Sequence, residues 1–163
     1  MRAADASRPA ADWPRALRRY LVFIGAANLL WEALQLPLYT IWATGTAREI
    51  AFAVVHCTAG DFIIAGIALM LAVAMVGERA WPMRALRPVA LLAIAFGLGY
   101  TIFSEWLNIV VRQSWAYSEL MPVVPAIGTG LAPLAQWLVV PLGASWWARL
   151  GVAATPEPVE NRR

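Results

Sequence analysis

Long apolar blocks dominate the hydrophobic pattern of the chain, and short polar or proline-containing joints separate them. Four blocks are long enough to cross a membrane, because about 20 apolar residues span a hydrocarbon core roughly 30 Å thick. The blocks cover residues 20–42, 50–77, 88–111 and 125–150. The pattern therefore predicts an all-α integral membrane bundle of four transmembrane helices.

The segments outside these blocks are too short to form a soluble domain. Residues 1–19 are rich in Ala, Arg, Asp and Pro, and residues 151–163 form a second polar segment. We interpret the first as a mobile cytoplasmic tail and the second as a disordered cytoplasmic tail. Residues 20–150 then form one transmembrane domain.

Charge gives the orientation of the predicted spans. All 13 basic residues are arginines, and only Arg48 and Arg112 lie in the joints that follow the first and third blocks. The positive-inside bias places both termini in the cytoplasm of a bacterial inner membrane, with the chain crossing it several times. The net charge of +3 does not indicate nucleic-acid binding, because the arginines lie at block ends.

Polar side chains form one stripe on the first block and one on the third. In both blocks they recur at offsets of 0, 4, 7 and 11 residues, which places them within one narrow arc of a helix with 3.6 residues per turn. The first stripe is Asn28, Glu32, Gln35 and Tyr39, and the second is Thr101, Glu105, Asn108 and Arg112. We expect the two stripes to face each other or a shared cavity.

The second block is less regular. His56 and Asp61 are five residues apart, which separates them by about 140° around a helix. We predict that His56 points inward and that Asp61 pairs with another helix. His56 and Glu105 each lie about 10 Å below the outer end of their block, at ~1.5 Å per residue. The polar half of the bundle is therefore expected to be the periplasmic half.

Ionisable side chains inside a span cost about 2.5–3.5 kcal/mol each, so they are candidates for function. We predict a buried pocket that binds a cation, a proton or a small ligand, with Glu32, His56, Glu105 and Asn108 as its main residues. The supporting residues would be Asn28, Gln35, Asp61, Thr101, Arg112 and Gln136. Because one His and two carboxylates can hold Zn, Fe or Mn, His56, Glu32 and Glu105 are also candidate metal ligands. No motif identifies a cofactor.

Two other functions stay open. One is a membrane-embedded enzyme for a lipid or isoprenoid-like substrate, in which Glu105 and His56 exchange protons. The other is a structural or assembly subunit whose polar residues only set the helix packing. The expected partners are the lipid bilayer and a small apolar ligand or metal ion, and small residues on the second and fourth blocks permit a homodimer.

The joint "RQSWAYSELMPVVP" is the longest and the most aromatic. Two interpretations of Trp115, Tyr117 and Met121 are open. They lie on the bilayer surface as an aromatic belt, or they fold over the helix ends as a lid.

The segments "FSEWLN", "SWAYSELMP" and "GTGLAPLAQWLVVP" resemble a group of small four-helix bacterial inner-membrane proteins of uncharacterised function. The resemblance implies the fold and the location but no activity. In architecture the chain is also similar to the four-helix sterol-isomerase type of membrane protein, where acidic and aromatic residues line an apolar ligand pocket. That second likeness is a fold-level analogy, which carries no residue roles.

Overall fold

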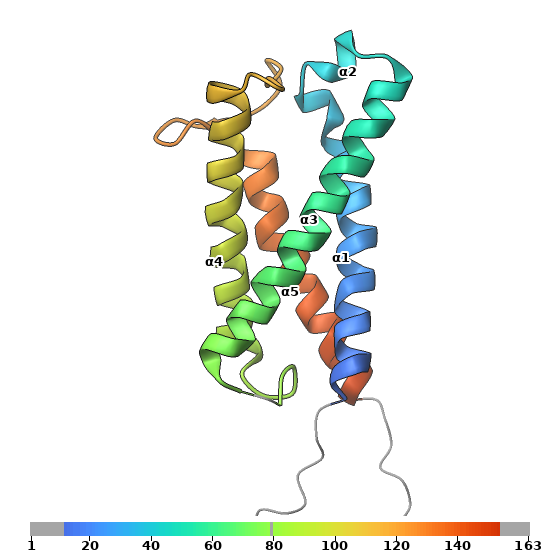
Figure 1. Ribbon diagram of the computed structural model, residues 1–163, viewed down its shortest axis with the longest axis vertical. Helices are drawn as coiled ribbons and strands as arrows, with labels where there is room; N and C mark the ends of the chain where they lie inside the picture. Colours follow the sequence, from blue (N-terminus) through green and yellow to red (C-terminus); the bar gives the residue numbers. More distant parts are fainter. Residues whose placement is uncertain (1–11, 79, 154–163) are drawn as a thin grey trace, which may run out of the picture.

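The computed structural model describes residues 12–78 and 80–153, and this part of the chain is mostly helical (Figure 1). The long helices are α1 (Trp13–Gln35), α3 (Ala47–Val76), α4 (Leu86–Glu105) and α5 (Leu131–Ala153). The short elements are η1 (Leu36–Leu38), α2 (Ile41–Thr44), the π-helical segment η2 (Trp106–Val111), and the strands β1 (Val123–Val124) and β2 (Thr129–Gly130). The two strands pair antiparallel.

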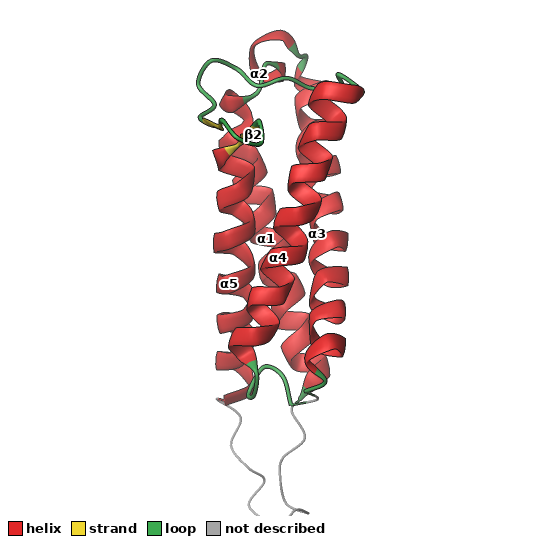
Figure 2. Ribbon diagram, turned by 90° about the vertical axis from the view of Figure 1, so that its left-hand side faces the viewer, coloured by secondary structure: helices red, strands yellow, loops and turns green. Residues whose placement is uncertain are grey.

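The long helices pack around a common axis. α1 packs against α3 and α5, and α4 packs against the same two helices. α1 and α4 therefore lie diagonally across from each other. The start of α1 and the end of α5 lie at the same end of the molecule as the α3–α4 connection (Figure 1). The other connecting segments gather at the opposite end (Figure 2).

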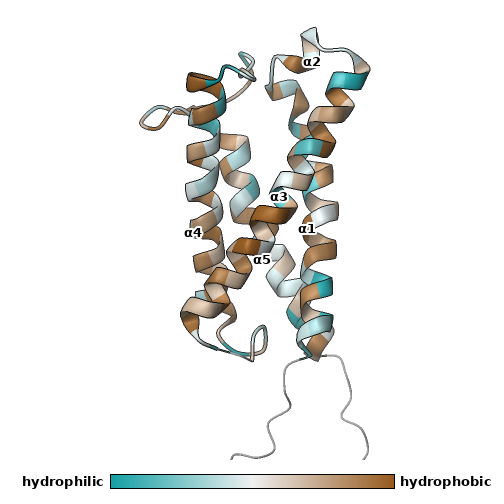
Figure 3. Ribbon diagram, in the orientation of Figure 1, coloured by the Kyte–Doolittle hydropathy of each residue, from teal (hydrophilic) through white to brown (hydrophobic). Residues whose placement is uncertain are grey.

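Three helical segments are long and apolar enough to cross a membrane: Trp13–Leu38, Ala47–Val76 and Leu86–Val111. Large apolar side chains also face outward, for example Leu34 and Leu91, which are 71% and 65% exposed. Hydrophobic residues dominate α3 and α4 in the half nearer their connection (Figure 3). α5 is not among these three segments.

The observed helix bounds differ from the expected spans at both ends of the chain. α1 covers 13–35 rather than 20–42. It begins early because Asp12 caps it, accepting a hydrogen bond from the Arg15 amide at 3.2 Å, and it ends where Pro37 cannot continue the α-helical hydrogen bonding. Residues 13–19 are thus helical and not part of a tail. Residues 1–11 and 154–163 of the two predicted tails lie outside the described residues, and α5 extends to residue 153.

α5 begins at Leu131, six residues after the expected start. The residues before it form the β1–β2 hairpin, whose turn contains Gly128 at φ 68°. A glycine adopts this left-handed conformation without the steric cost of a Cβ atom. The hairpin keeps Pro125 and the residues after it out of the helix.

Candidate functional site

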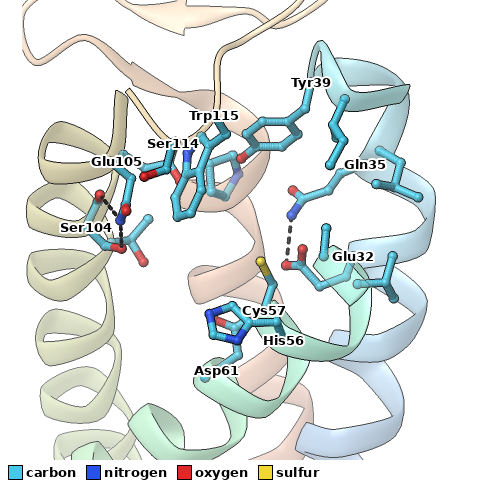
Figure 4. Close-up of a pocket in the computed structure, with 18 of the residues that line it drawn as sticks. Glu32, Gln35, Tyr39, His56, Cys57, Asp61, Ser104, Glu105, Ser114 and Trp115 are labelled. Atoms are coloured by element: carbon cyan, nitrogen blue, oxygen red, sulfur yellow. Dashed lines mark hydrogen bonds between the residues drawn. The ribbon is translucent and has the colours of Figure 1, made fainter. Parts of the chain in front are cut away.

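A cavity of about 850 Å³ lies between the helices at the end opposite the α3–α4 connection. Its polar lining residues come from several elements that are distant in the sequence (Figure 4). They include Glu32 and Gln35 of α1, Asp61 of α3, Glu105 of α4 and Gln136 of α5. The shared cavity expected between the stripes of α1 and α4 is therefore present.

The floor of the cavity is a cluster of carboxyl and amide groups centred on Gln136. Its Nε2, which carries two N–H groups, lies 2.9 Å from Asn28 Oδ1, 3.1 Å from Glu32 Oε1 and 2.8 Å from Asp61 Oδ2. Glu32 Oε1 also accepts from Gln35 Nε2 at 2.8 Å. One amide thus connects α1, α3 and α5, and it brings the Glu32 and Asp61 carboxylates next to each other.

Glu105 lies on the other side of the cavity and is 8% exposed. It accepts a hydrogen bond from the hydroxyl of Tyr117, which in turn accepts from the Gly130 amide at 2.7 Å. These hydrogen bonds tie the end of α4 to the long connection and to β2, directly before α5. Glu105 is therefore held in place from outside its own helix.

The segment after α4 folds across the helix ends and pairs with the segment after α1. The Thr40 amide donates to Ala116 O at 3.0 Å, and the Ser118 amide donates to Leu38 O at 2.9 Å. The rings of Tyr39 and Tyr117 lie 5.5 Å apart. These contacts hold residues 37–40 and 114–118 together across the helix ends, and we call these two segments the lid segments.

The three predicted lid residues have different positions. Trp115 lines the cavity, and Tyr117 contacts it through its bond to Glu105. Met121 is buried against the hairpin, where a Cβ atom on Gly130 would lie 2.8 Å from its sulfur. Met121 therefore holds the lid to the start of α5 and does not line the cavity.

Burial raises the pKa of two tyrosines in the lid segments, Tyr39 and Tyr117. Desolvation raises the pKa of Tyr39, and the nearby Glu105 carboxylate adds to the effect. Desolvation also raises the pKa of Tyr117, together with its hydrogen bond to Glu105. Both phenols stay protonated at neutral pH, so Tyr117 is a donor to Glu105 under ordinary conditions.

The cavity is closed on the side of α1 and α5 and open between α3 and α4. Its lining residues Glu32, Gln35 and Gln136 are buried. By contrast, Phe52 of α3 and Tyr100 of α4 also line it and are 67% and 46% exposed. The opening therefore faces sideways, toward the surroundings of the two helices.

The stripe predicted for α1 faces the interior as expected, with Asn28, Glu32 and Gln35 all buried. All four residues of the stripe predicted for the third block line the cavity, but the α-helix ends at Glu105. There the helix widens into η2, in which the Arg112 amide bonds five residues back, to Leu107 O at 2.8 Å. A π-helical turn changes the register of the following side chains.

Asn108 lies within η2 and Arg112 directly after it. Asn108 lines the cavity, but its amide nitrogen turns back to its own helix and donates to Ser104 O at 2.9 Å. Arg112 is exposed at the margin of the cavity, as is Arg48 of α3. Thr101, at the start of the stripe, is buried and lines the cavity.

His56 lies at the opening rather than at the floor. It lines the cavity and is exposed, and its ring stacks on Phe52 at 5.3 Å between centroids. Within residues 12–78 and 80–153, no three His, Cys, Asp or Glu side chains are placed to hold a metal ion. The structure thus does not bring His56, Glu32 and Glu105 together as a set of metal ligands.

Two residues are more central than the sequence suggested. Asp61 and Gln136 were expected only to support the pocket, yet they join Glu32 at its floor. Asp61 does pair with other helices, as predicted. The importance of Gln136 has a signal in the sequence, since it is the one amide inside the fourth apolar block. Periodicity gives no comparable signal for Tyr117, which lies in a connection.

Comparisons with protein families, with curated proteins and with solved structures each found no match to this chain.

Proposed function

We propose that the chain is a multi-pass membrane protein that binds a small ligand in its cavity. The observation that carries this proposal is a cavity of about 850 Å³ into which Glu32, Asp61 and Glu105 point from three different helices. Ligand pockets commonly measure ~300–1,000 Å³ and have mostly apolar walls with a few polar groups. Carboxylates are costly inside a membrane segment, which favours a role beyond packing.

The proposal includes four membrane spans, because α5 packs along α1 and α4 between the three apolar segments. Among the described arginines, Arg48 and Arg112 lie at the cavity end. The others are Arg15, Arg18, Arg19, Arg84, Arg87 and Arg149, in α1, near the α3–α4 connection and in α5. The positive-inside rule then favours a cytoplasmic location for the end with the α3–α4 connection. It favours a periplasmic location for the cavity end in a bacterial inner membrane.

The side opening supports a ligand that reaches the cavity from the bilayer. Because the lid segments 37–40 and 114–118 cover the helix ends, the exposed margin lies between α3 and α4. In a membrane, the part of this margin nearer the middle of the bundle would face lipid tails. The part nearer the lid segments would face the headgroup region. A ligand with an apolar body and a polar group suits such a path.

A second candidate function is proton exchange on a lipid or isoprenoid-like substrate. The hydrogen-bonded pair of Glu105 and Tyr117 at the cavity favours it, with His56 at the opening as a further acid or base. A purely structural role is the third candidate, in which the polar cluster only sets the helix packing.

A pair of glycine variants tests ligand binding. Gly60 of α3 lines the cavity, and a Cβ atom there meets nothing within 4 Å, so Gly60→Leu adds a side chain at the cavity with no clash at its Cβ atom. Gly99 of α4 is equally unobstructed but is exposed and does not line the cavity, so Gly99→Leu is the matched control. Native mass spectrometry of the full chain, released gently from membranes, measures bound small molecules.

We expect the wild-type protein and Gly99→Leu to retain a bound small molecule that Gly60→Leu loses. Both variants should remain folded, because leucine favours helix more than glycine does. If the wild-type protein carries no bound molecule and Gly60→Leu is only more stable, the binding proposal fails and the structural candidate is favoured. Conversion of an added lipid by the wild-type protein alone would favour the enzyme.

A further inference from the structure

We propose that the polar group of the ligand is an organic ammonium ion, and that this ion replaces a proton held between the Glu32 and Asp61 carboxyls. The inference rests on the proposed function and adds the chemical class of the ligand. It depends on the balance of hydrogen-bond donors and acceptors at the cavity floor and on one unpaired buried oxygen.

The amide of Gln136 has too few hydrogens for the oxygens around it. Its nitrogen carries two N–H groups, but it lies within hydrogen-bonding distance of three oxygens, on Asn28, Glu32 and Asp61, at 2.8 to 3.1 Å. Gln35 supplies one more donor, to Glu32. Within the described part of the chain, no arginine donates to either carboxylate. The floor therefore has an excess of acceptors.

The Oε1 atom of Gln35 supports the same conclusion independently. It is buried without a hydrogen-bond partner, on a side chain that is 7% exposed and lines the cavity. Figure 4 shows Gln35 next to Glu32 on the cavity side of α1. Leaving a buried carbonyl oxygen unpaired is unfavourable. A primary ammonium group carries three N–H donors, so it can serve this oxygen and the adjacent carboxylates together.

The two carboxyl groups also favour a positive charge. Two ionised carboxylates that approach one nitrogen repel each other in a buried site, and one proton on the pair removes one of the two charges. An arriving ammonium ion neutralises the same charge. The O–H bond of the protonated carboxyl then breaks and the proton leaves to bulk water, so the net charge of the site does not change.

The walls suit an organic cation with an apolar body. The aromatic rings of Tyr39, Tyr100, Trp115 and Trp137 line the cavity, and aromatic faces attract ammonium groups. An inorganic cation would gain little from such walls. The side opening between α3 and α4 also admits a ligand from an apolar environment.

Other charged and titratable groups face the pair from the neighbouring elements. Those lining the cavity are His56, Cys57, Glu105, Tyr39, Tyr100, Arg48, Glu49 and Arg112, and Tyr117 contacts the site through Glu105. α5 contributes Gln136, which does not titrate. Arg48 and Arg112 are exposed at the margin, where water and salt screen their charges. The buried groups around the pair are acidic or neutral.

Isothermal titration calorimetry of the full chain in lipid nanodiscs tests the ligand class with three matched probes. These are 2-phenylethylamine, 2-phenylethanol and 3-phenylpropionate. We expect the amine to bind at least about tenfold more tightly than the alcohol, because charge-assisted hydrogen bonds are roughly twice as strong as neutral ones. The carboxylate should not bind. Near neutral pH, titrations in two buffers of different ionisation enthalpy should show about one proton released per bound amine.

Asp61→Asn removes one carboxyl of the pair and with it the shared proton. We expect this variant to bind the amine at least about tenfold more weakly and to release no proton. Cys57→Ala is the control in the same lining, and it should retain both properties. If Asp61→Asn does not fold, the proton release measured for the wild-type protein decides the point alone.

Several results would overturn the inference. Equal or tighter binding of the alcohol or the carboxylate excludes the ammonium class, and so does failure of all three probes to bind. Amine binding without proton release excludes the exchange. If Gly60→Leu still loses a co-purified molecule in these cases, the proposed function stands and only the class of ligand is wrong.

Discussion

At the end that carries the α3–α4 connection, aromatic and small side chains fill the space between the helices, whereas at the opposite end the helices enclose a cavity. Trp81 has no exposed surface, and its ring lies 5.3 Å from Trp13 and 5.9 Å from Tyr20. Ala68 and Ala72 of α3 are buried nearby in the same core. The cavity end contains Glu32, Asp61 and Glu105 instead.

The difference follows from the inclination of α3. This helix begins beside α1 at the cavity end and crosses toward α4 at the other end (Figure 1). Alanines let the helices approach closely where they converge. Where α3 and α4 diverge, polar side chains and connecting segments surround a space that packing does not fill. The apolar core therefore packs closely at one end of the bundle, and the other end keeps an open cavity.

Trp81→Ala should cause the largest loss of stability. It removes a fully buried ring from the close-packed end, and such a truncation costs about 3–5 kcal/mol. Denaturant unfolding in detergent, followed by circular dichroism, measures the change. Trp146→Ala, at an outward-facing position that is 61% exposed, is the control and should change little. A small effect of Trp81→Ala would mean that the stability resides at the cavity end.

Gln136→Leu should have an intermediate effect at the cavity end. It removes the donor that Asn28, Glu32 and Asp61 share, and leaving buried acceptors unpaired costs ~1–3 kcal/mol. Leu138→Ala, two residues further along α5 and 46% exposed, is the matched control. The same unfolding measurement applies. If Gln136→Leu is instead more stable than the wild-type protein, the prediction is wrong, and the polar cluster lowers the stability relative to apolar packing.

Tyr117→Phe should have the smallest effect, about 1 kcal/mol, because it removes the bond to Glu105 and keeps the ring. The pKa of Tyr117 is raised, so the stabilisation is complete below the unfolded tyrosine pKa of about 10 and is lost as the pH rises through the folded value. The difference in stability between the wild-type protein and Tyr117→Phe should therefore shrink in strongly alkaline solution. A constant difference would show that Tyr117 stabilises the lid without its proton.

Much of the polar site could be predicted from single-helix periodicity. Asn28, Glu32 and Gln35 share a face of α1 because α-helical geometry holds through residue 35. Asn108 and Arg112 also line the cavity, although the π-helical segment η2 follows Glu105 and changes the helical geometry there. Periodicity assumes one helix type throughout, and a local widening of the helix depends on its surroundings.

The sequence by itself determined the helical class, the apolar length of α1, α3 and α4, and the presence of buried carboxylates, because these depend on composition and local spacing. Only the tertiary structure decided that Asp61 and Gln136 meet Glu32, that Tyr117 reaches Glu105, and that the cavity opens between α3 and α4. The physical reason is that the rotation and inclination of each helix result from packing against its neighbours, which no single segment specifies.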